Sequence, residues 1–203
     1  MKLYGSQTSP YVHKVRALVH ETGLEAKVAF IQQDPRKNTG GYHRKYPLAR
    51  VPALETDKGE VLFDSPVICE YLDSLHSKRK MFPAKGAMRW RALKLQALAD
   101  GILDCAVPLR GELMRPPQQR SPEFVRSREA AIRRAVDALE AAAKSGDMNQ
   151  RVDIGTLAVA CALGYLDFRF AVMGWRRRHP ALSKWFEAFS RRPSIAGTAP
   201  PQQ

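Results

Sequence analysis

The hydrophobic pattern of the chain changes once, at a basic segment over 76–86 that contains Pro83 and Gly86. Before this segment, short strand-like runs alternate with helical runs, which is the pattern of an α/β domain. After it, apolar residues recur at helical spacing only. We therefore predict an α/β domain over 1–76, a linker over 77–86 and an all-α domain over 87–203.

The first domain is expected to contain one β-α-β unit followed by a hairpin and a helix. Two strand-like runs flank a helical run that ends at Gly23. Two further runs, 51–55 and 60–63, flank the turn-rich tetrapeptide TDKG at 56–59, which suits an antiparallel connection. The sheet is therefore predicted to be mixed.

The second domain is predicted to consist of helices only. The segment 152–170 is apolar on nearly all sides, so we expect it at the centre of this domain. Asp153 is placed to cap this helix, with Thr156 at its third position. Other helices are expected at 87–112, 121–144 and 181–190, and the tail after them, which contains Pro and Gln, is expected to be loosely ordered.

The chain carries a large positive charge. It has 203 residues, with 33 Lys and Arg against 20 Asp and Glu, which gives a formal net charge of +13. Such an excess can attract nucleic acid, an anionic membrane or acidic ligands. The basic clusters are scattered along the chain, however, and no nucleic-acid motif or basic stripe accompanies them. We therefore favour a solvated basic surface over nucleic-acid binding.

Other features predict a soluble, cytoplasmic protein. Hydrophobic residues make up 44% of the chain and charged residues 26%, as in soluble globular proteins. No apolar run is expected to reach the roughly 20 residues of a membrane helix, and residues 1–10 do not resemble a signal segment. Cys69, Cys105 and Cys161 are predicted to be buried free thiols, and neither the cysteines nor the histidines have metal-ligand spacing.

A serine placed to cap a helix, with a proline directly after it, occurs twice in the first domain, as Ser9-Pro10 and Ser65-Pro66. Each such helix start offers unpaired backbone N–H groups and a partial positive charge, so each can hold a small anion. A helix start with a hydroxyl donor also stabilises a thiolate. Two starts in one small domain suggest a ligand with two anionic ends, whose thiol Ser9 is placed to activate.

These residues also have less specific interpretations. Each serine can be a helix cap and nothing more. A catalytic pair of Ser9 and His13 is rejected, because no G-x-S-x-G turn or orienting acid accompanies it, and His13 is expected on the solvated helix surface. Exchange through a protein thiol is disfavoured, since residues 5–12 contain no cysteine.

Motifs along nearly the whole chain follow one another in a characteristic order, as KLYGSQTSPYVHKVR, YPLARVPAL, FDSPVICEYLD, ALADGILD and DIGTLAVACALGYLDFRF. Together they resemble the cytosolic glutathione S-transferases, particularly small bacterial members. The resemblance implies a thioredoxin-like α/β domain that holds glutathione, an all-α domain that forms the wall of the electrophile pocket, and a homodimer. One departure is Tyr46-Pro47-Leu48-Ala49, where the family usually has Asn-Pro-Leu-Gly.

The resemblance assigns roles to individual residues around the thiol. It implies that Ser9 donates a hydrogen bond to the glutathione thiolate, and Thr8 is a neighbouring candidate for the same catalytic role. It also implies that Val51, which precedes a predicted cis Pro52, pairs its backbone with the cysteinyl part of glutathione.

The resemblance places the γ-glutamyl end of glutathione at the second helix start. There Asp64 would bind the ammonium group and Ser65 the carboxylate. Asp100, in the first helix of the second domain, is a further glutathione-binding candidate. It lies with Gln96 and Asp104 in an otherwise apolar stripe, where polar groups need partners. Simple solvation of Asp100 at the surface is an equal alternative.

The activity implied is that of a glutathione transferase in detoxification, with glutathione as co-substrate and no metal. The activated thiolate would attack a hydrophobic electrophile or a peroxide. The alternative is a non-catalytic protein of the same fold, whose basic surface engages an acidic partner. The sequence does not identify the acceptor or the subclass.

Overall fold

The chain returns at its C-terminal end to the domain in which it begins. The structure is a computed structural model that describes residues 1–201. One unit contains Met1–Ala84 together with the segment that starts at Arg192, and the other contains Lys85–Arg191. The expected domain over 87–203 thus differs from the observed unit at its C-terminal end, where residues from Arg192 onward join the first unit.

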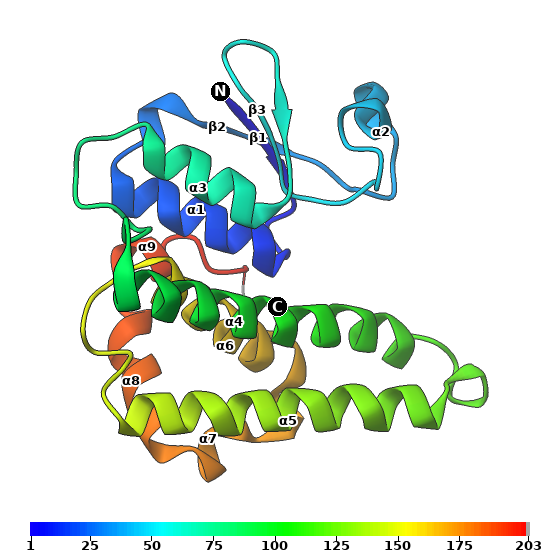
Figure 1. Ribbon diagram of the computed structural model, residues 1–203. Helices are drawn as coiled ribbons and strands as arrows, with labels where there is room; N and C mark the ends of the chain where they lie inside the picture. Colours follow the sequence, from blue (N-terminus) through cyan, green and yellow to red (C-terminus); the bar gives the residue numbers. More distant parts are fainter. Residues whose placement is uncertain (202–203) are drawn as a thin grey trace. The chain divides into compact units, whose positions relative to one another are not determined.

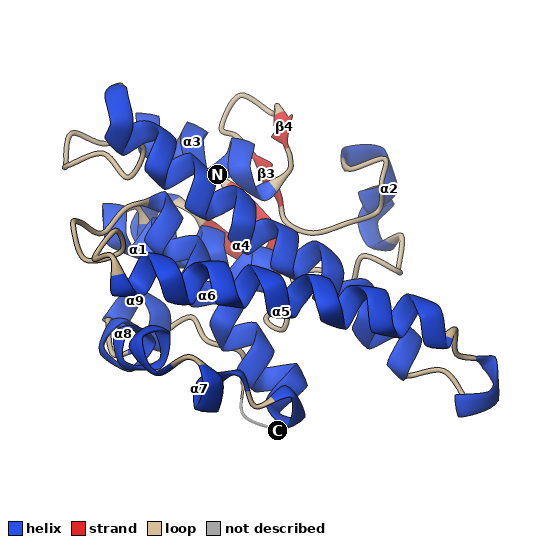
Figure 2. Ribbon diagram, turned by 60° about the horizontal axis from the view of Figure 1, so that its bottom comes forward, coloured by secondary structure: helices blue, strands red, loops and turns tan. Residues whose placement is uncertain are grey.

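The first unit is built on a mixed four-stranded sheet with the strand order β2-β1-β3-β4. β1 (Lys2–Gly5) pairs in parallel with β2 (Ala29–Gln32) and antiparallel with β3 (Ala53–Glu55). β3 in turn pairs antiparallel with β4 (Val61–Leu62). The strands, red in Figure 2, confirm the predicted mixed sheet and its hairpin.

Two helices pack against each other beside this sheet. α1 (Pro10–Thr22) and α3 (Ser65–Ser74) start at the same end of the sheet, as Figure 1 shows. The start of α1 lies very close to β1, because a Cβ added to Gly5 would come within 2.6 Å of a Val12 methyl carbon. α1 ends as predicted at Gly23, whose φ of 73° is a left-handed conformation that glycine adopts without strain.

The connection from β2 to β3 contains short helical turns that the sequence pattern did not predict. They are η2 (Thr39–Gly41) and α2 (Tyr42–Lys45), and a further turn, η1 (Glu25–Lys27), precedes β2. Tyr42 anchors the connection, because its ring is buried and its hydroxyl donates a hydrogen bond of 2.5 Å to the Arg50 carbonyl. This bond fixes the backbone just before Val51.

The C-terminal segment is fastened to α1 through α9 (Pro193–Ala196). The Glu21 carboxylate of α1 accepts hydrogen bonds of 2.9 Å from the Arg192 guanidinium and of 2.5 Å from the Ser194 hydroxyl. Ser194 and Ile195 are buried. The prediction of a loosely ordered tail is therefore wrong for this segment, because it holds buried residues and paired charges.

The second unit is all helical, which confirms the predicted fold class of this part of the chain. Its helices and helical turns are α4 (Gly86–Leu113), η3 (Pro117–Gln119), α5 (Pro122–Lys144), α6 (Ile154–Phe170), η4 (Ala171–Met173), α7 (Trp175–Arg178) and α8 (Pro180–Ser190). α6 is buried along nearly its whole length and packs on α4, and a Cβ on Gly155 would lie 2.5 Å from the Ala92 carbonyl oxygen. Its central position agrees with its apolar sequence.

The start of α6 is the predicted capping box. The Asp153 carboxylate accepts hydrogen bonds from the backbone N–H groups of Gly155 (3.0 Å) and Thr156 (3.2 Å), and the Thr156 hydroxyl accepts one from the Asp153 N–H. Asp153 is fully buried, and the Arg91 guanidinium of α4 binds its second carboxylate oxygen. This contact joins the N-terminal part of α4 to the start of α6.

By length and composition, one segment does reach the size of a membrane span, contrary to the sequence-based expectation. Ile154–Met173 has 20 residues and a mean hydropathy of 1.5. In this structure 61% of that window is buried inside the protein, and the segment is the core helix α6 with the turn that follows it. Its apolar composition therefore has an explanation in the packing of the second unit.

Candidate functional site

Ser9 occupies the position that the sequence predicts, at the N-cap of α1 with Pro10 after it. Its hydroxyl oxygen accepts a hydrogen bond of 3.4 Å from the Val12 N–H, and its side chain is half-buried. Within residues 1–201, no acceptor lies in hydrogen-bond range of the Ser9 hydroxyl proton. The hydroxyl therefore caps the helix and still has a proton to donate, so the two interpretations of Ser9 are compatible.

Thr8 belongs to a short chain of hydroxyl groups before α1. Its hydroxyl lies 3.1 Å from the Ser6 hydroxyl, and the Thr8 N–H also points to the Ser6 oxygen at 3.4 Å. The run Ser6-Gln7-Thr8-Ser9 concentrates hydroxyl groups there, and Ser6 is a member of this group that the motifs do not indicate. Because Thr8 has a partner for its hydroxyl, Ser9 is the better placed of the two candidates to donate to a ligand.

Val51 presents unsatisfied backbone groups next to the sheet. The Val51–Pro52 peptide bond is cis, as predicted. Val51 itself is half-buried, and neither its N–H nor its C=O forms a hydrogen bond with another part of the chain that the structure describes. Because β1 pairs with β3 directly after Pro52, this free backbone lies beside the end of β1 that leads to Ser9.

The second helix start differs by one residue from the prediction. α3 begins at Ser65, so Asp64 and not Ser65 occupies the N-cap position, and no side chain bonds to the cap. Ser65 is buried, with an exposed fraction of 1%. The Asp64 side chain is exposed and forms no ion pair or hydrogen bond within the described residues 1–201. The site thus offers a free carboxylate and, directly after it, backbone N–H groups at the positive end of α3.

A stacked pair of aromatic rings joins the Val51 segment to the start of α3. The rings of Tyr46 and Phe63 have centroids 4.2 Å apart with an interplanar angle of 12°. Burial, together with the negative charge of Asp64 nearby, raises the pKa of Tyr46. The structure therefore brings together three of the predicted positions of the first unit: the start of α1, Val51 and the start of α3.

Asp100 belongs to the second unit, where it lies half-buried in the middle of α4. Gln96, one turn earlier, is buried, and its side-chain nitrogen has no hydrogen-bond partner within residues 1–201. The polar stripe of α4 is thus present as the sequence indicates. A contact between Asp100 and glutathione stays a prediction.

His13 is buried and not solvated, contrary to the sequence-based expectation. Its Nε2 lies 3.3 Å from the Ile195 carbonyl oxygen of the C-terminal segment, and burial lowers its pKa to about 4. Since the ring contacts Ile195, its role is to hold the C-terminal segment against α1. A catalytic pair with Ser9 has no support in this geometry.

The three cysteines form no disulfide within the described residues. Cys69 and Cys161 are buried thiols that form no disulfide within residues 1–201, as predicted, whereas Cys105 is only half-buried. The prediction that all three cysteines are buried is therefore wrong for Cys105, because part of this residue on α4 is accessible to solvent. Among residues 1–201, no group of His, Cys, Asp and Glu side chains could hold a metal ion.

Comparison with known proteins relates both units to one family. Residues 8–75 match the family described as "Glutathione S-transferase, N-terminal domain", and residues 122–188 match "Glutathione S-transferase, C-terminal domain". The uncharacterized GST-like protein YibF of Escherichia coli K12 is 40% identical over 204 residues, with 100% of both chains covered. The motifs that suggested the resemblance are therefore part of a match that extends along the whole chain.

Solved structures resemble the protein over the same length. A glutathione transferase family member from Pseudomonas fluorescens Pf-5, crystallised with bound glutathione, has a TM-score of 0.94 and 42% identity and covers 98% of each chain. A second structure from this organism, with bound S-(propanoic acid)-glutathione, has a TM-score of 0.90 at 42% identity and covers 99% of this chain and 100% of that one. These similarities confirm the predicted combination of a thioredoxin-like domain and an all-α domain.

Proposed function

Because the chain belongs to the glutathione S-transferase family, we propose that it binds glutathione in its first unit and activates the thiol through Ser9. The observation that carries this proposal is the Ser9 hydroxyl, whose oxygen caps α1 while its proton has no acceptor within residues 1–201. A hydrogen bond from this hydroxyl, added to the positive end of α1, favours the thiolate over the thiol. The pKa of the bound thiol is therefore lowered toward neutral pH.

The other parts of glutathione are matched by the remaining groups of the site. The free N–H and C=O of Val51 suit an antiparallel pairing with the cysteinyl backbone. The exposed Asp64 carboxylate suits the γ-glutamyl ammonium, and the backbone N–H of Ser65 suits the adjacent carboxylate. Each ligand group thereby meets a protein group of complementary charge or hydrogen-bonding capacity.

The reaction that we propose is attack of the glutathione thiolate on a hydrophobic electrophile. A sulfur–carbon bond forms, the bond from carbon to the leaving group breaks, and the leaving group departs with the electron pair of that bond. The thiol proton is released to solvent. With an organic hydroperoxide, two glutathione molecules reduce the peroxide to an alcohol and water and become the disulfide. Both reactions need a positioned thiolate and a site that stabilises it.

The ligand of the Pseudomonas relative suggests acceptors to try first. S-(propanoic acid)-glutathione is a thioether that carries a short carboxylic acid. Addition of the thiolate to a small unsaturated acid such as acrylate would give a thioether of this kind. The sulfur–carbon bond forms at the β carbon, the carbon–carbon π bond breaks, and the α carbon takes up a proton. We therefore propose small unsaturated acids as one acceptor class.

The test is calorimetric titration with glutathione on the wild type, Ser9→Ala and Thr8→Val, with the ultraviolet absorbance of the bound thiolate followed against pH. We expect all three proteins to bind glutathione, and we expect Ser9→Ala alone to lose the lowered thiol pKa. Turnover is then measured with chlorodinitrobenzene, acrylate and cumene hydroperoxide. Light scattering on the same samples tests the proposed homodimer.

The outcomes separate the enzyme from a binding protein. If Ser9→Ala keeps the lowered thiol pKa, the role given to Ser9 is wrong. If the wild type binds glutathione but turns over none of the three acceptors, the result favours the alternative of a non-catalytic binding protein. In that case, binding of an acidic partner to the basic surface should weaken strongly at high salt, while glutathione affinity changes little.

A further inference from the structure

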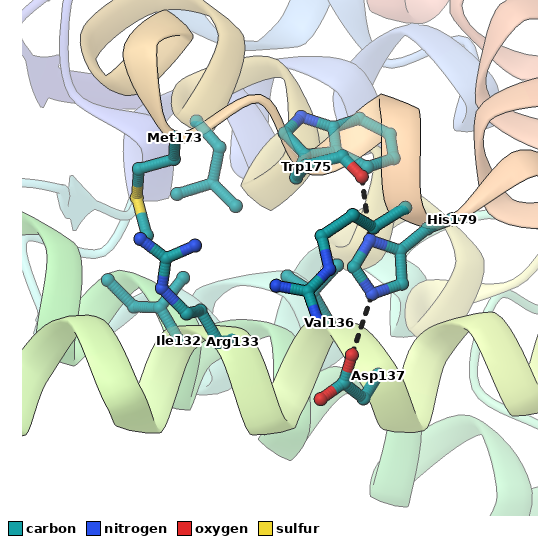
Figure 3. A pocket seen from close by; sticks show the side chains of 9 residues that line it. Ile132, Arg133, Val136, Asp137, Met173, Trp175 and His179 are labelled. Carbon is teal, nitrogen blue, oxygen red and sulfur yellow. Dashed lines mark hydrogen bonds and ion pairs between the residues drawn. The ribbon is translucent and has the colours of Figure 1, made fainter.

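The second unit contains a pocket of its own, formed where α5, α6, η4 and α7 meet (Figure 3). Its volume is about 160 Å³. Ile132 and Val136 of α5, Leu166 of α6 and Trp175 of α7 give it an apolar lining. The lining residues all lie between Lys85 and Arg191, so the pocket belongs to the second unit and contains none of the residues assigned to glutathione.

The aromatic wall of this pocket is fixed in place by polar contacts behind it. The indole N–H of Trp175 donates a hydrogen bond of 2.8 Å to the Asp167 carboxylate. The Arg176 guanidinium binds the same carboxylate at 2.6 Å and lies over the Trp175 ring, 4.9 Å from its centroid. Because these contacts hold the ring without a ligand, little ordering is needed when a ligand binds.

Two guanidinium groups accompany the apolar lining. Arg133 projects from α5 on the side of Met173, as Figure 3 shows, and Arg178 contributes from α7. The carboxylate nearest to Arg133 is that of Glu129, at 3.8 Å, and this pair is exposed to solvent. Arg178 forms no ion pair or hydrogen bond with any residue in the described part of the chain. Both guanidinium groups can therefore bind an anion without giving up a strong partner.

The one carboxylate of the lining is already engaged. The Nε2 of His179 lies 2.8 Å from the Asp137 carboxylate, and its Nδ1 lies 2.6 Å from the Trp175 carbonyl oxygen. Figure 3 draws both contacts as dashed lines. Both ring nitrogens of His179 are therefore occupied by contacts within the second unit. The Asp137 carboxylate is thus held by His179, and the two positive charges of Arg133 and Arg178 in the lining outnumber its single negative charge.

We propose that this pocket binds a small organic anion that consists of one apolar ring and a carboxylate. The ring would lie against Trp175 and Val136, and the carboxylate would face Arg133 and Arg178. The pocket volume of about 160 Å³ suits one aromatic ring, because a cavity of about 150 Å³ in another protein holds one benzene molecule. Guanidinium groups bind carboxylates in a planar, bidentate manner, which favours a carboxylate over an uncharged polar group.

The experiment compares three probes that separate the ring from the charge. Benzoate carries both, benzamide has the ring without the charge, and acetate has the charge without the ring. Binding to the full chain is measured by titration calorimetry and by saturation-transfer NMR. We expect benzoate to bind at least about tenfold more tightly than benzamide, and acetate not to bind over the same concentration range.

Matched variants assign the binding to this pocket. Arg133→Gln and Arg178→Gln should each weaken benzoate binding by about tenfold, since each removes one charge-assisted contact. Arg134→Gln removes a neighbouring exposed charge that does not line the pocket, and it should leave the affinity unchanged. Ser9→Ala should leave it unchanged as well, because Ser9 belongs to the first unit.

Four results would overturn the proposal. The first is that benzoate does not bind to the wild type, and the second is that benzoate and benzamide bind equally. The third is that Arg134→Gln weakens binding as much as Arg178→Gln does, which would indicate a diffuse effect of the basic surface. The fourth is that Ser9→Ala removes the binding of benzoate, which would place that ligand in the first unit. All arginine variants should bind glutathione as the wild type does, so this proposal can fail without the proposed function failing.

Discussion

At the scale of single residues, Ala49 stands out because it has a backbone conformation that suits glycine. Its φ is 50°, in a turn where its N–H bonds to the Tyr46 carbonyl at 2.9 Å. A Cβ in the left-handed region costs about 1–2 kcal/mol, partly offset by the greater flexibility that glycine gives the unfolded chain. We expect Ala49→Gly to raise the free energy of unfolding by about 1 kcal/mol, measured by urea denaturation. Ala138→Gly, in the helix α5, is the control and should lower it by about 1 kcal/mol. Equal losses in both variants would contradict the argument.

The second prediction concerns His13 and the pH dependence of the free energy of unfolding. Burial lowers its pKa from 6.5 to about 4, so the unfolded chain binds a proton at a higher pH than the folded protein does. The contribution of His13 to stability is therefore fully present above pH 6.5 and is lost as the pH falls toward 4, by about 3 kcal/mol in all. Urea denaturation at several pH values in this window should show that His13→Gln has a shallower dependence than the wild type. Parallel curves for the two proteins would show that His13 does not titrate in this way.

At the scale of helices, the Asp153 carboxylate makes two kinds of contact. It caps α6 and binds Arg91 of α4, and both side chains are largely buried. Asp153→Asn keeps an oxygen for the cap but leaves the Arg91 charge without its partner, so we expect a loss of about 3 kcal/mol in the free energy of unfolding. Ser121→Ala, at the exposed cap of α5, should cost only about 1 kcal/mol. Thermal and urea denaturation compare the two variants, and similar losses would mean that the Arg91 contact contributes little.

The observed helix starts show which helix boundaries can be predicted from neighbouring residues in the sequence. Ser9-Pro10 and the Asp153 box were predicted correctly, because a cap and its partners lie within four residues of each other. The start of α3 was predicted one residue too late, since Asp64 takes the cap position and Ser65 is already helical and buried. α2 was missed because its four residues, Tyr42–Lys45, are too few to show a helical period.

At the scale of the whole molecule, the change of hydrophobic pattern predicts the two units, and it cannot predict contacts between distant segments. Glu21 and Arg192 are 171 residues apart, and nothing near either residue indicates that they meet. The residues of the candidate site also lie far apart in the sequence, and local patterns do not show that they meet. Ser9, Val51 and Asp64 could be selected as residue types in motifs, but their free hydroxyl proton, backbone groups and carboxylate become visible only when the hydrogen bonds of the folded chain are known.

The return of the chain to the first unit leads to a prediction about truncation. Deletion of 192–203 removes the partners of Glu21 and uncovers the surface on which Ile195 is buried. Burial of one such side chain is worth about 1.5–3 kcal/mol, so hydrogen exchange of the α1 amides should become about tenfold to a hundredfold faster. Exchange of the α6 amides should change little, because α6 belongs to the other unit. Deletion of 199–203 is the control, since it keeps α9 and its contacts with Glu21. If this shorter deletion accelerates exchange in α1 as much as the longer one, the contacts of Arg192, Ser194 and Ile195 are not what protects the helix.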